Sequence, residues 1–484
     1  MADYSPMMKQ YFEVKEKYPN TLLFFRLGDF YEMFFNDAKI ASRELELTLT
    51  GRDCGQEERA PMCGVPFHSA ETYIARLVAK GYKVAICEQM EDPALAKGIV
   101  KRSVIRVITP GTVMESSMLD EAKNNYIASA YYQGDKVGIC FADISTGELE
   151  ATTLTAEKGE TLSRAVIDAL SRFTPREILI NPEFTDLTDV AKFISDKLSA
   201  SLECMDFAVY EPLHAEETVK AQFHPEVLER SDVLNFPEIT AALSALLEYL
   251  SRTQITGLER MEEIRIYSQA KTMRLDLNTR RNLELLETMR SKERRGSLLW
   301  VLDDTKTAMG ARLISRWILS PLKNKEKIEE RLEGVEELYN ASVLRVGLQE
   351  TLGGIKDVQR LAGKISNGNV NPKDLDTLRK SLEALPSLCF QLSGFASKIM
   401  QNLLSSFPNT DDLVALLSDT IAEDPSAMTK DGGYIKEGYD SELDELRNMR
   451  AHAAGLIKDM ETREKERTDI RTLKISFNRV FGYY

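Results

Sequence analysis

The hydrophobic pattern of this chain changes once, near residue 237, and that change limits the folds open to it. Before this point, short strand-like stretches alternate with stretches of helical periodicity. From about residue 237 to the end, apolar residues recur every three to four positions, and strand-like stretches are absent until residue 471. The chain has 484 residues, more than one hydrophobic core usually holds. We therefore expect a multidomain protein, mixed α/β at first and all-α afterwards.

The first 120 residues predict a small mixed α/β domain. Ser5 followed by Pro6 is a good helix start, and this helix should end before Pro19. The other expected elements are two strands within 21–35, a helix at 37–47, a loop at 51–59, a helix from 70 to 81, and strands at 82–87 and 103–108.

A second α/β domain is expected from about residue 125. Three strands, at 126–132, 137–144 and 149–154, are followed by a helix, a strand and a further helix. This is the order of a ribonuclease-H-like fold, and nucleases of that fold hold two metal ions on clustered carboxylates. Asp143 and Glu148 are the acidic pair that such a nuclease would use here. A structural role at the turn between two strands is the simpler interpretation of this pair.

The C-terminal part predicts long helices. An apolar seam suited to helix pairing consists of Leu443, Leu446, Met449, Ala453, Leu456 and Met460. Beyond it, residues 473–478 alternate apolar and polar side chains, as a strand does. The chain stops soon after, at Tyr484, within this pattern. Because a lone strand is not stable, we expect the sequence to be part of a longer protein.

Composition narrows the function classes. The longest apolar runs are too short to span a membrane, and the N-terminal residues 1–6 show no secretory signal. Six scattered cysteines indicate free thiols in a reducing cytoplasm. The sequence contains no Cys-x-x-Cys pair, so we expect no zinc site. The net charge of −14 argues against general polyanion binding. Residues 271–316 contain eleven Lys and Arg against six Asp and Glu, for which we expect a solvated helix face.

The most unusual local pair is Phe30 and Glu32, directly after a Gly-Asp turn. Since alternate side chains of a strand share a face, this ring and this carboxylate lie side by side. An aromatic ring can wedge into stacked bases, and a carboxylate can accept a hydrogen bond from a base edge. Taken alone, the pair is more typical of ordinary strand packing than of a binding site.

A nucleotide site of the P-loop type is absent from the sequence. That motif needs Gly, four residues and then Gly-Lys-Ser/Thr, so that backbone N–H groups and the lysine surround the phosphates. The nearest approach is Gly363-Lys364-Ile365, which has Val358 in place of the first glycine. We therefore expect no ATPase and no other enzyme activity from these 484 residues.

Taken together, several motifs resemble the bacterial MutS family of DNA mismatch repair proteins, in one register along the whole chain. The segment 28–34 (GDFYEMF) is similar to the mismatch-recognition signature of that family. The further matching segments are 60–70 (APMCGVPFHSA), 109–112 (TPGT), 275–285, 296–317, 440–447 (DSELDELR) and 477–484 (FNRVFGYY).

The resemblance implies a domain plan. Residues 1–112 would form the mismatch-recognition domain, 123–250 a ribonuclease-H-like connector, 258–437 a helical core and lever, and 438–484 the start of a clamp. The family's ATPase domain and most of its clamp would lie outside this sequence. ATP and magnesium are thus implied for the complete family protein and no cofactor for this part. One small departure is Gln359, where the family often has Glu.

The resemblance also implies a function and its residues. Phe30 would stack on or wedge beside a mispaired base, and Glu32 would hydrogen-bond the displaced base, to initiate DNA mismatch repair. Expected backbone or groove contacts are Arg102 as first choice, then Lys101, Arg106, Met62, Val65, Pro66 and His68. Implied partners are mismatched duplex DNA, the MutL protein through the connector, and a second copy of the chain, in the nucleoid-associated cytoplasm. The metal-dependent nuclease and a non-catalytic helical scaffold are the alternatives.

Overall fold

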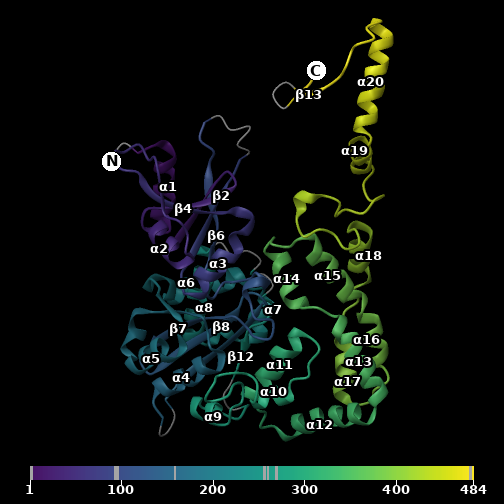
Figure 1. Cartoon of the computed structure of the whole chain (residues 1–484). Helices are drawn as coiled ribbons and strands as arrows, with labels where there is room; N and C mark the ends of the chain where they lie inside the picture. Colours follow the sequence, from purple (N-terminus) through teal and green to yellow (C-terminus); the bar gives the residue numbers. More distant parts are fainter. Residues whose placement is uncertain are drawn as a thin grey trace. The chain divides into compact units, whose positions relative to one another are not determined.

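The computed structural model describes residues 4–91, 98–156, 160–253, 258, 261–267, 271–478 and 482–484. Its internal contacts divide the chain into two units, one made of residues 1–370 with 387–406 and the other of 371–386 with 407–484. Two mixed sheets and the helices that cover them come first, followed by helices, as the change of pattern near residue 237 predicts (Figure 1).

The N-terminal domain is a six-stranded mixed sheet with the order β3-β4-β2-β1-β5-β6. Side chains of β1 alternate between two cores, so Leu22 and Phe24 pack beneath α2 and α3, and Leu23 and Phe25 pack against α1. This burial on both faces explains the uninterrupted apolar run of β1. The element bounds are α1 Pro6–Lys17, β1 Leu22–Leu27, β2 Phe30–Phe34, α2 Phe35–Leu45, β3 Thr50–Arg52, β4 Ala60–Pro66, α3 Ala70–Ala79, β5 Val84–Gln89 and β6 Arg102–Ile108.

The second domain has a six-stranded sheet with the order β11-β10-β7-β8-β9-β12, in which β7, β8 and β9 are antiparallel as expected. Helices α4 and α5 cover one face, and α6 and α8 cover the other. The bounds are β7 Tyr126–Gln133, β8 Lys136–Asp143, β9 Glu148–Thr155, α4 Leu162–Phe173, β10 Glu177–Ile180, α5 Thr188–Phe193, β11 Ser201–Cys204, α6 Pro212–Gln222, α7 Pro225–Ser231, α8 Pro237–Arg252 and β12 Arg265–Ile266.

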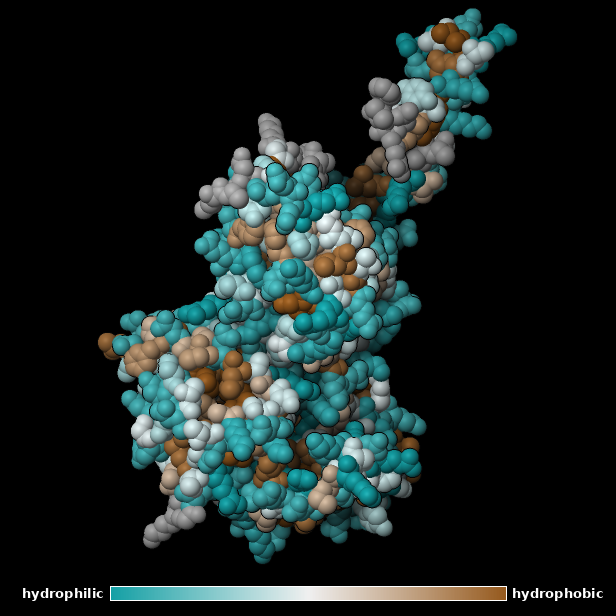
Figure 2. Space-filling view, turned by 60° about the vertical axis from the view of Figure 1, so that its left-hand side comes forward, coloured by the Kyte–Doolittle hydropathy of each residue, from teal (hydrophilic) through white to brown (hydrophobic). Residues whose placement is uncertain are grey.

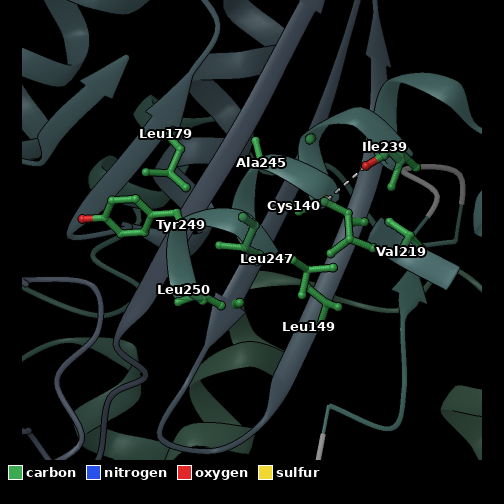
Figure 3. Close-up of a cluster of buried hydrophobic side chains, with 14 of the residues drawn as sticks. Cys140, Leu149, Leu179, Val219, Ile239, Ala245, Leu247, Tyr249 and Leu250 are labelled. Atoms are coloured by element: carbon green, nitrogen blue, oxygen red, sulfur yellow. Dashed lines mark hydrogen bonds between the residues drawn. The ribbon is translucent and has the colours of Figure 1, made fainter. Parts of the chain in front are cut away.

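Helix α8 is the central helix of this domain. Figure 3 shows its Ile239, Ala245 and Leu247 packed among strand residues such as Cys140 and Leu149. The helix begins directly on β8, where a Cβ at Gly138 would lie 2.0 Å from the carbonyl oxygen of Glu238. Only glycine therefore permits this approach of helix to sheet.

The helical part follows the predicted pattern with one correction. β12, a two-residue edge strand paired with β9, lies where the sequence predicts no strand, because so short a segment has no alternating pattern. Helices of the first unit include α9 Leu277–Asn282, α10 Leu298–Leu302, α11 Ala308–Leu319, α12 Lys325–Asn340, α13 Ser342–Gly354, α14 Val358–Ser366 and α17 Lys398–Ser406. Helix α16 spans Leu385–Leu392.

The second unit contains α15 Pro372–Glu383, α18 Asp411–Thr420, α19 Ser441–Ala451, α20 Ala453–Thr468 and the two-residue strands β13 Phe477–Asn478 and β14 Gly482–Tyr483. The strand expected at 473–478 is thus confined to its last two residues. Residues 479–481 of the motif FNRVFGYY lie outside the described residues. In the predicted apolar seam, Leu446, Met449 and Met460 are each about half exposed.

For the basic segment 271–316 the sequence predicts a solvated helix face, and this expectation is wrong for several of its arginines. Arg312 of α11 is buried and forms two hydrogen bonds with Asp357, at 2.6 and 2.9 Å, and one with Gln359 at 2.7 Å. Arg316 lies 3.3 Å from Glu148 of the second domain. Arg312 therefore joins α11 to the start of α14, and Arg316 joins α11 to the second sheet domain.

Hydrophilic side chains dominate the face of the molecule in Figure 2, and the brown hydrophobic residues form separate patches. Among the described residues, no helix is both long and apolar enough to cross a membrane.

Candidate nucleic-acid interface

The Gly28-Asp29 turn presents Phe30 at the start of a central strand. Gly28 adopts a φ of +59°, which glycine tolerates, and the chain reverses between Leu27 and Phe30. Tyr31 and Met33 point into the core beneath α2 and α3, whereas the Phe30 side chain on the opposite face is 46% exposed. The strand therefore exposes a large apolar ring to solvent on one face while its other face is buried in the core.

Glu32, beside Phe30 on the same face, is ion-paired with Arg52 of β3. Strand β4 lies between them in the sheet, and its Gly64 pairs directly with Glu32. A Cβ at Gly64 would lie 3.4 Å from Cγ of Glu32 and 3.8 Å from the ring of Phe30. The missing side chain at Gly64 therefore leaves room for the side chains of both Phe30 and Glu32.

A second set of contacts, made by Arg26, Tyr31 and Phe67, holds the Gly28-Asp29 turn in place. The guanidinium of Arg26 lies 3.6 Å from the ring centroid of Phe67 and 3.3 Å from the carboxylate of Glu88. The hydroxyl of Tyr31 donates to the same carboxylate. Burial, and then this hydrogen bond, raise the pKa of Tyr31 well above its usual value. The turn is further tied to the next loop by the N–H of Phe67, which donates to the carbonyl of Asp29 at 3.0 Å.

The remaining residues expected at a DNA surface divide by burial. Lys101 and His68 are exposed, and Met62 and Pro66 are half-buried, so all four are accessible. Val65 is fully buried in the core beneath α2 and α3. The expectation that its side chain contacts a DNA groove is therefore wrong. The apolar side chain of Val65 packs inward because it alternates with Gly64 and Pro66 along β4.

The two arginines of β6 are engaged within the domain. Arg106 is buried, with its guanidinium 2.5 Å from Glu115 and 3.2 Å from the carbonyl of Thr112, which corrects its expected role on the surface. Arg102 donates to the carbonyl of Arg26 at 2.7 Å and to Gln10 at 3.0 Å. Burial lowers the pKa of Arg102. Its guanidinium therefore fastens β6 to β1 and α1, and a phosphate contact would require it to leave these partners.

Two residues of this site escape sequence reasoning. Arg52 belongs to the short strand β3, in a segment expected to be a loop, and only the sheet order brings it to Glu32. Gly64 is part of the motif at 60–70, but nothing in the sequence indicates that it lies opposite Glu32.

The acidic pair of the second domain has structural roles. Asp143 is fully buried, and its carboxylate accepts hydrogen bonds from Ser145 and from Asn124 and the N–H of Asn125. Glu148 lies 3.3 Å from Arg316. The described residues contain no group of three or more His, Cys, Asp or Glu placed to hold a metal ion. This geometry gives no support to the nuclease alternative.

Comparison with known families gives three matches in chain order. The family model described as MutS domain I matches residues 5–117, MutS domain II matches 125–264, and MutS domain III matches 278–473. The sheet carrying Phe30 and Glu32 falls in the first match, the sheet carrying Asp143 in the second, and most of the helices in the third.

Curated relatives match along the whole chain. A protein of Ruminiclostridium cellulolyticum named DNA mismatch repair protein MutS is 45% identical over 484 residues, which is 100% of this chain and 55% of that protein. A protein of the same name from Clostridium perfringens is 47% identical, over 99% of this chain and 52% of its own length. The chain thus spans about half the length of these relatives.

Proposed function

This chain belongs to the MutS family of DNA mismatch repair proteins, and from that premise we propose that Phe30 and Glu32 detect mismatched or unpaired bases in duplex DNA. The observation that carries the proposal is the exposure of Phe30 on a strand whose other apolar side chains, Tyr31, Met33 and Phe34, are buried. Phe30 stacks on, or wedges beside, a mispaired base. Unstacking a step costs a few kcal/mol and costs least where pairing is already weak, so mismatched DNA accepts the ring most readily.

Glu32 accepts a hydrogen bond from the displaced base. Its pairing with Arg52 supports this role, because the guanidinium fixes the carboxylate beside Phe30 and offsets its charge near phosphates. The accessible side chains Lys101, His68, Met62 and Pro66 are the proposed backbone and groove contacts. Arg52 joins them as a candidate phosphate contact, and Arg102, Arg106 and Val65 serve the domain's own structure.

The wider family supplies the remaining proposals. We assign residues 1–112 to mismatch recognition, 123–250 to the connector, 258–437 to the core and lever, and 438–484 to the arm leading to the clamp. The connector docks the MutL protein, the complete protein acts as a homodimer in the nucleoid-associated cytoplasm, and its ATP and magnesium bind outside these 484 residues. We assign no catalytic residue here.

Competitive binding tests the central proposal. The chain is titrated with duplexes that contain a G·T mismatch, an unpaired T or full pairing, all at one stated salt concentration. Phe30→Ala should remove the preference for the first two duplexes. The binding free energy lost on these duplexes should be about 1–3 kcal/mol, the usual contribution of one base stacked on an aromatic ring. Phe207→Ala is the matched control, since Phe207 is exposed to a similar degree in the second domain. Equal preference in the parent and Phe30→Ala proteins would refute the stacking role.

A further inference from the structure

A small cavity lies where the second domain meets the start of the helices. Its lining comes from α4, from Tyr267, residues 272–275 and Arg280, and from Leu319 and Ser320 at the end of α11. Helix α4 packs against α9 in this region (Figure 1). The cavity volume is about 40 Å³. Since one water needs roughly 10–15 Å³, the space holds about three waters or one tetrahedral oxyanion.

The cavity is lined by polar groups that lack partners. Nε and Nη1 of Arg280, the hydroxyl of Tyr267 and the hydroxyl of Ser320 are all shielded from solvent, and none has a hydrogen-bond partner within the described part of the chain. Buried polar groups are nearly always hydrogen-bonded, so an unpaired set that shares one cavity points to a missing acceptor. A guanidinium N–H can only donate, and a hydroxyl can donate as well as accept.

The charge of the cavity wall is also unbalanced. The carboxylate of Asp168 is already committed to Arg274, at 2.7 Å, and to the N–H of Leu277 at 3.4 Å. Arg172 stacks over the ring of Tyr267, 4.7 Å from its centroid, and its only carboxylate neighbour among the described residues, Glu150, is 3.8 Å away. Arg280 has no ion pair within that same part of the chain.

The protonation of Arg280 reflects this position. Burial, and next the nearby charge of Arg172, lower the pKa of Arg280 to about 10. The guanidinium nevertheless remains charged at neutral pH. Arg172 and Arg280 thus share one wall of the cavity, and the nearby Asp168 and Asp276 offset the effects of burial and of Arg172 on Arg280 only in part. An anion between the two guanidiniums would relieve both their repulsion and the unpaired donors of Arg280.

We propose that this cavity binds a single phosphate group. The planar fork of Arg280 matches two oxygens of a phosphate, and the hydroxyls of Tyr267 and Ser320 supply two further donors. Met273, one of the lining residues, is about half exposed. The phosphate group could belong to free inorganic phosphate or to the end of a nucleotide. In either case its named donors would come from α9, from Tyr267 and from the end of α11.

Isothermal titration of the whole chain with inorganic phosphate, at constant ionic strength set by chloride, tests the proposal. We expect one saturable site. Arg280→Gln should weaken binding at least tenfold, and Tyr267→Phe should weaken it about threefold to tenfold. The control is Arg281→Gln, which removes the same charge from the neighbouring exposed residue and should leave binding unchanged. Tyr267→Phe keeps the ring, so it tests the site even if Arg280→Gln does not fold.

Competition separates the two sources of phosphate. If the terminal phosphate of a nucleotide is the occupant, ATP displaces inorganic phosphate from the parent protein, and this displacement disappears in Arg280→Gln. If the occupant is free phosphate, ATP leaves the bound phosphate in place. The proposal is overturned if the parent shows no saturable phosphate site, or if Arg280→Gln and Arg281→Gln weaken binding equally.

Discussion

The guanidinium of Arg52 is ion-paired with the carboxylate of Glu32, although strand β4 lies between the two strands that carry them. This pair places a positive charge beside the only carboxylate that we propose for base contact. With Arg52 in place, the Glu32 carboxylate can face a displaced base while its repulsion of the phosphates is reduced.

Glu32→Gln should raise the affinity for fully paired DNA, because it removes a negative charge beside the phosphates and keeps the shape of the side chain. The preference for mismatched DNA should fall as a result. Arg52→Gln should act in the opposite direction and weaken binding to both duplexes. Competition titrations at two salt concentrations measure both effects. An unchanged affinity of Glu32→Gln for paired DNA would contradict this account.

Gly64 should be sensitive to size. Gly64→Ala places a methyl group 3.3 Å from the carbonyl oxygen of Tyr31 and 3.4 Å from Glu32, which requires only small shifts. Gly64→Val adds two methyl groups toward Phe30 and should reduce the mismatch preference severalfold, with at most about 1–3 kcal/mol of lost stability. Duplex competition and thermal unfolding of the two variants check this graded effect. Equal preference in the parent, Ala and Val proteins would show that Gly64 leaves the site undisturbed.

Short-range sequence patterns predict the helix and the hairpin that carry the candidate interface. The Ser5-Pro6 start, the Gly28-Asp29 turn and the alternation after it correspond to α1 and to the β1–β2 hairpin. Exposure of Phe30 with burial of Tyr31 also follows from that alternation. These features depend on residues close in sequence, and that is why a single sequence is enough to predict them.

Pairings between distant segments were not predictable. Glu32 meets Arg52 only because β4 orders the sheet, and Arg312 reaches Asp357 across 45 positions of sequence. The same limit applies to Arg102 and Arg106, which look like surface cations in the sequence but bond inside the domain. An arginine's chemistry is visible in the sequence, whereas its partner is a tertiary property.

Lys83 should stabilise the contact between the first two domains. Its ammonium lies 3.1 Å from Glu177 and 2.6 Å from Glu203, and the hydroxyl of Tyr249, labelled in Figure 3, donates to the fully buried Glu177 at 2.6 Å. Lys83→Met removes the only cation that pairs with this buried carboxylate among the described residues, so we expect a loss of about 3–5 kcal/mol in urea unfolding at pH 7. The exposed Lys80→Met should lose less than about 1 kcal/mol.

The pH dependence of this contact follows from Lys83. Burial alone would lower the pKa of Lys83, but Glu177 and Glu203 raise it above its usual value. A raised lysine pKa gives stability that is complete below the unfolded value of about 10.4 and is lost as the pH rises through the folded value. The difference between the parent and Lys83→Met should therefore be constant from pH 7 to about 10 and shrink above it. A difference that persisted unchanged at higher pH would exclude the charge of Lys83 as its source.

Asp357 should make the packing of α11 against α14 sensitive to acid. Burial alone would raise the pKa of Asp357, but hydrogen bonds and charge from Arg312, with help from Arg360, lower it. A lowered carboxyl pKa gives stability that is present above the unfolded value of about 3.9 and is lost as the pH falls through the folded value. Asp357→Asn keeps an acceptor for the N–H of Arg360 but leaves Arg312 buried without its carboxylate, so it should cost about 3 kcal/mol at pH 7. This difference should shrink below about pH 4.

Both tryptophans, Trp300 and Trp317, lie in or next to α11, so their fluorescence during urea unfolding reports this region. Asp304→Asn, at an exposed neighbouring carboxylate, should change the unfolding midpoint little at either pH, and a similar cost for both variants would rule out the buried pair as the cause.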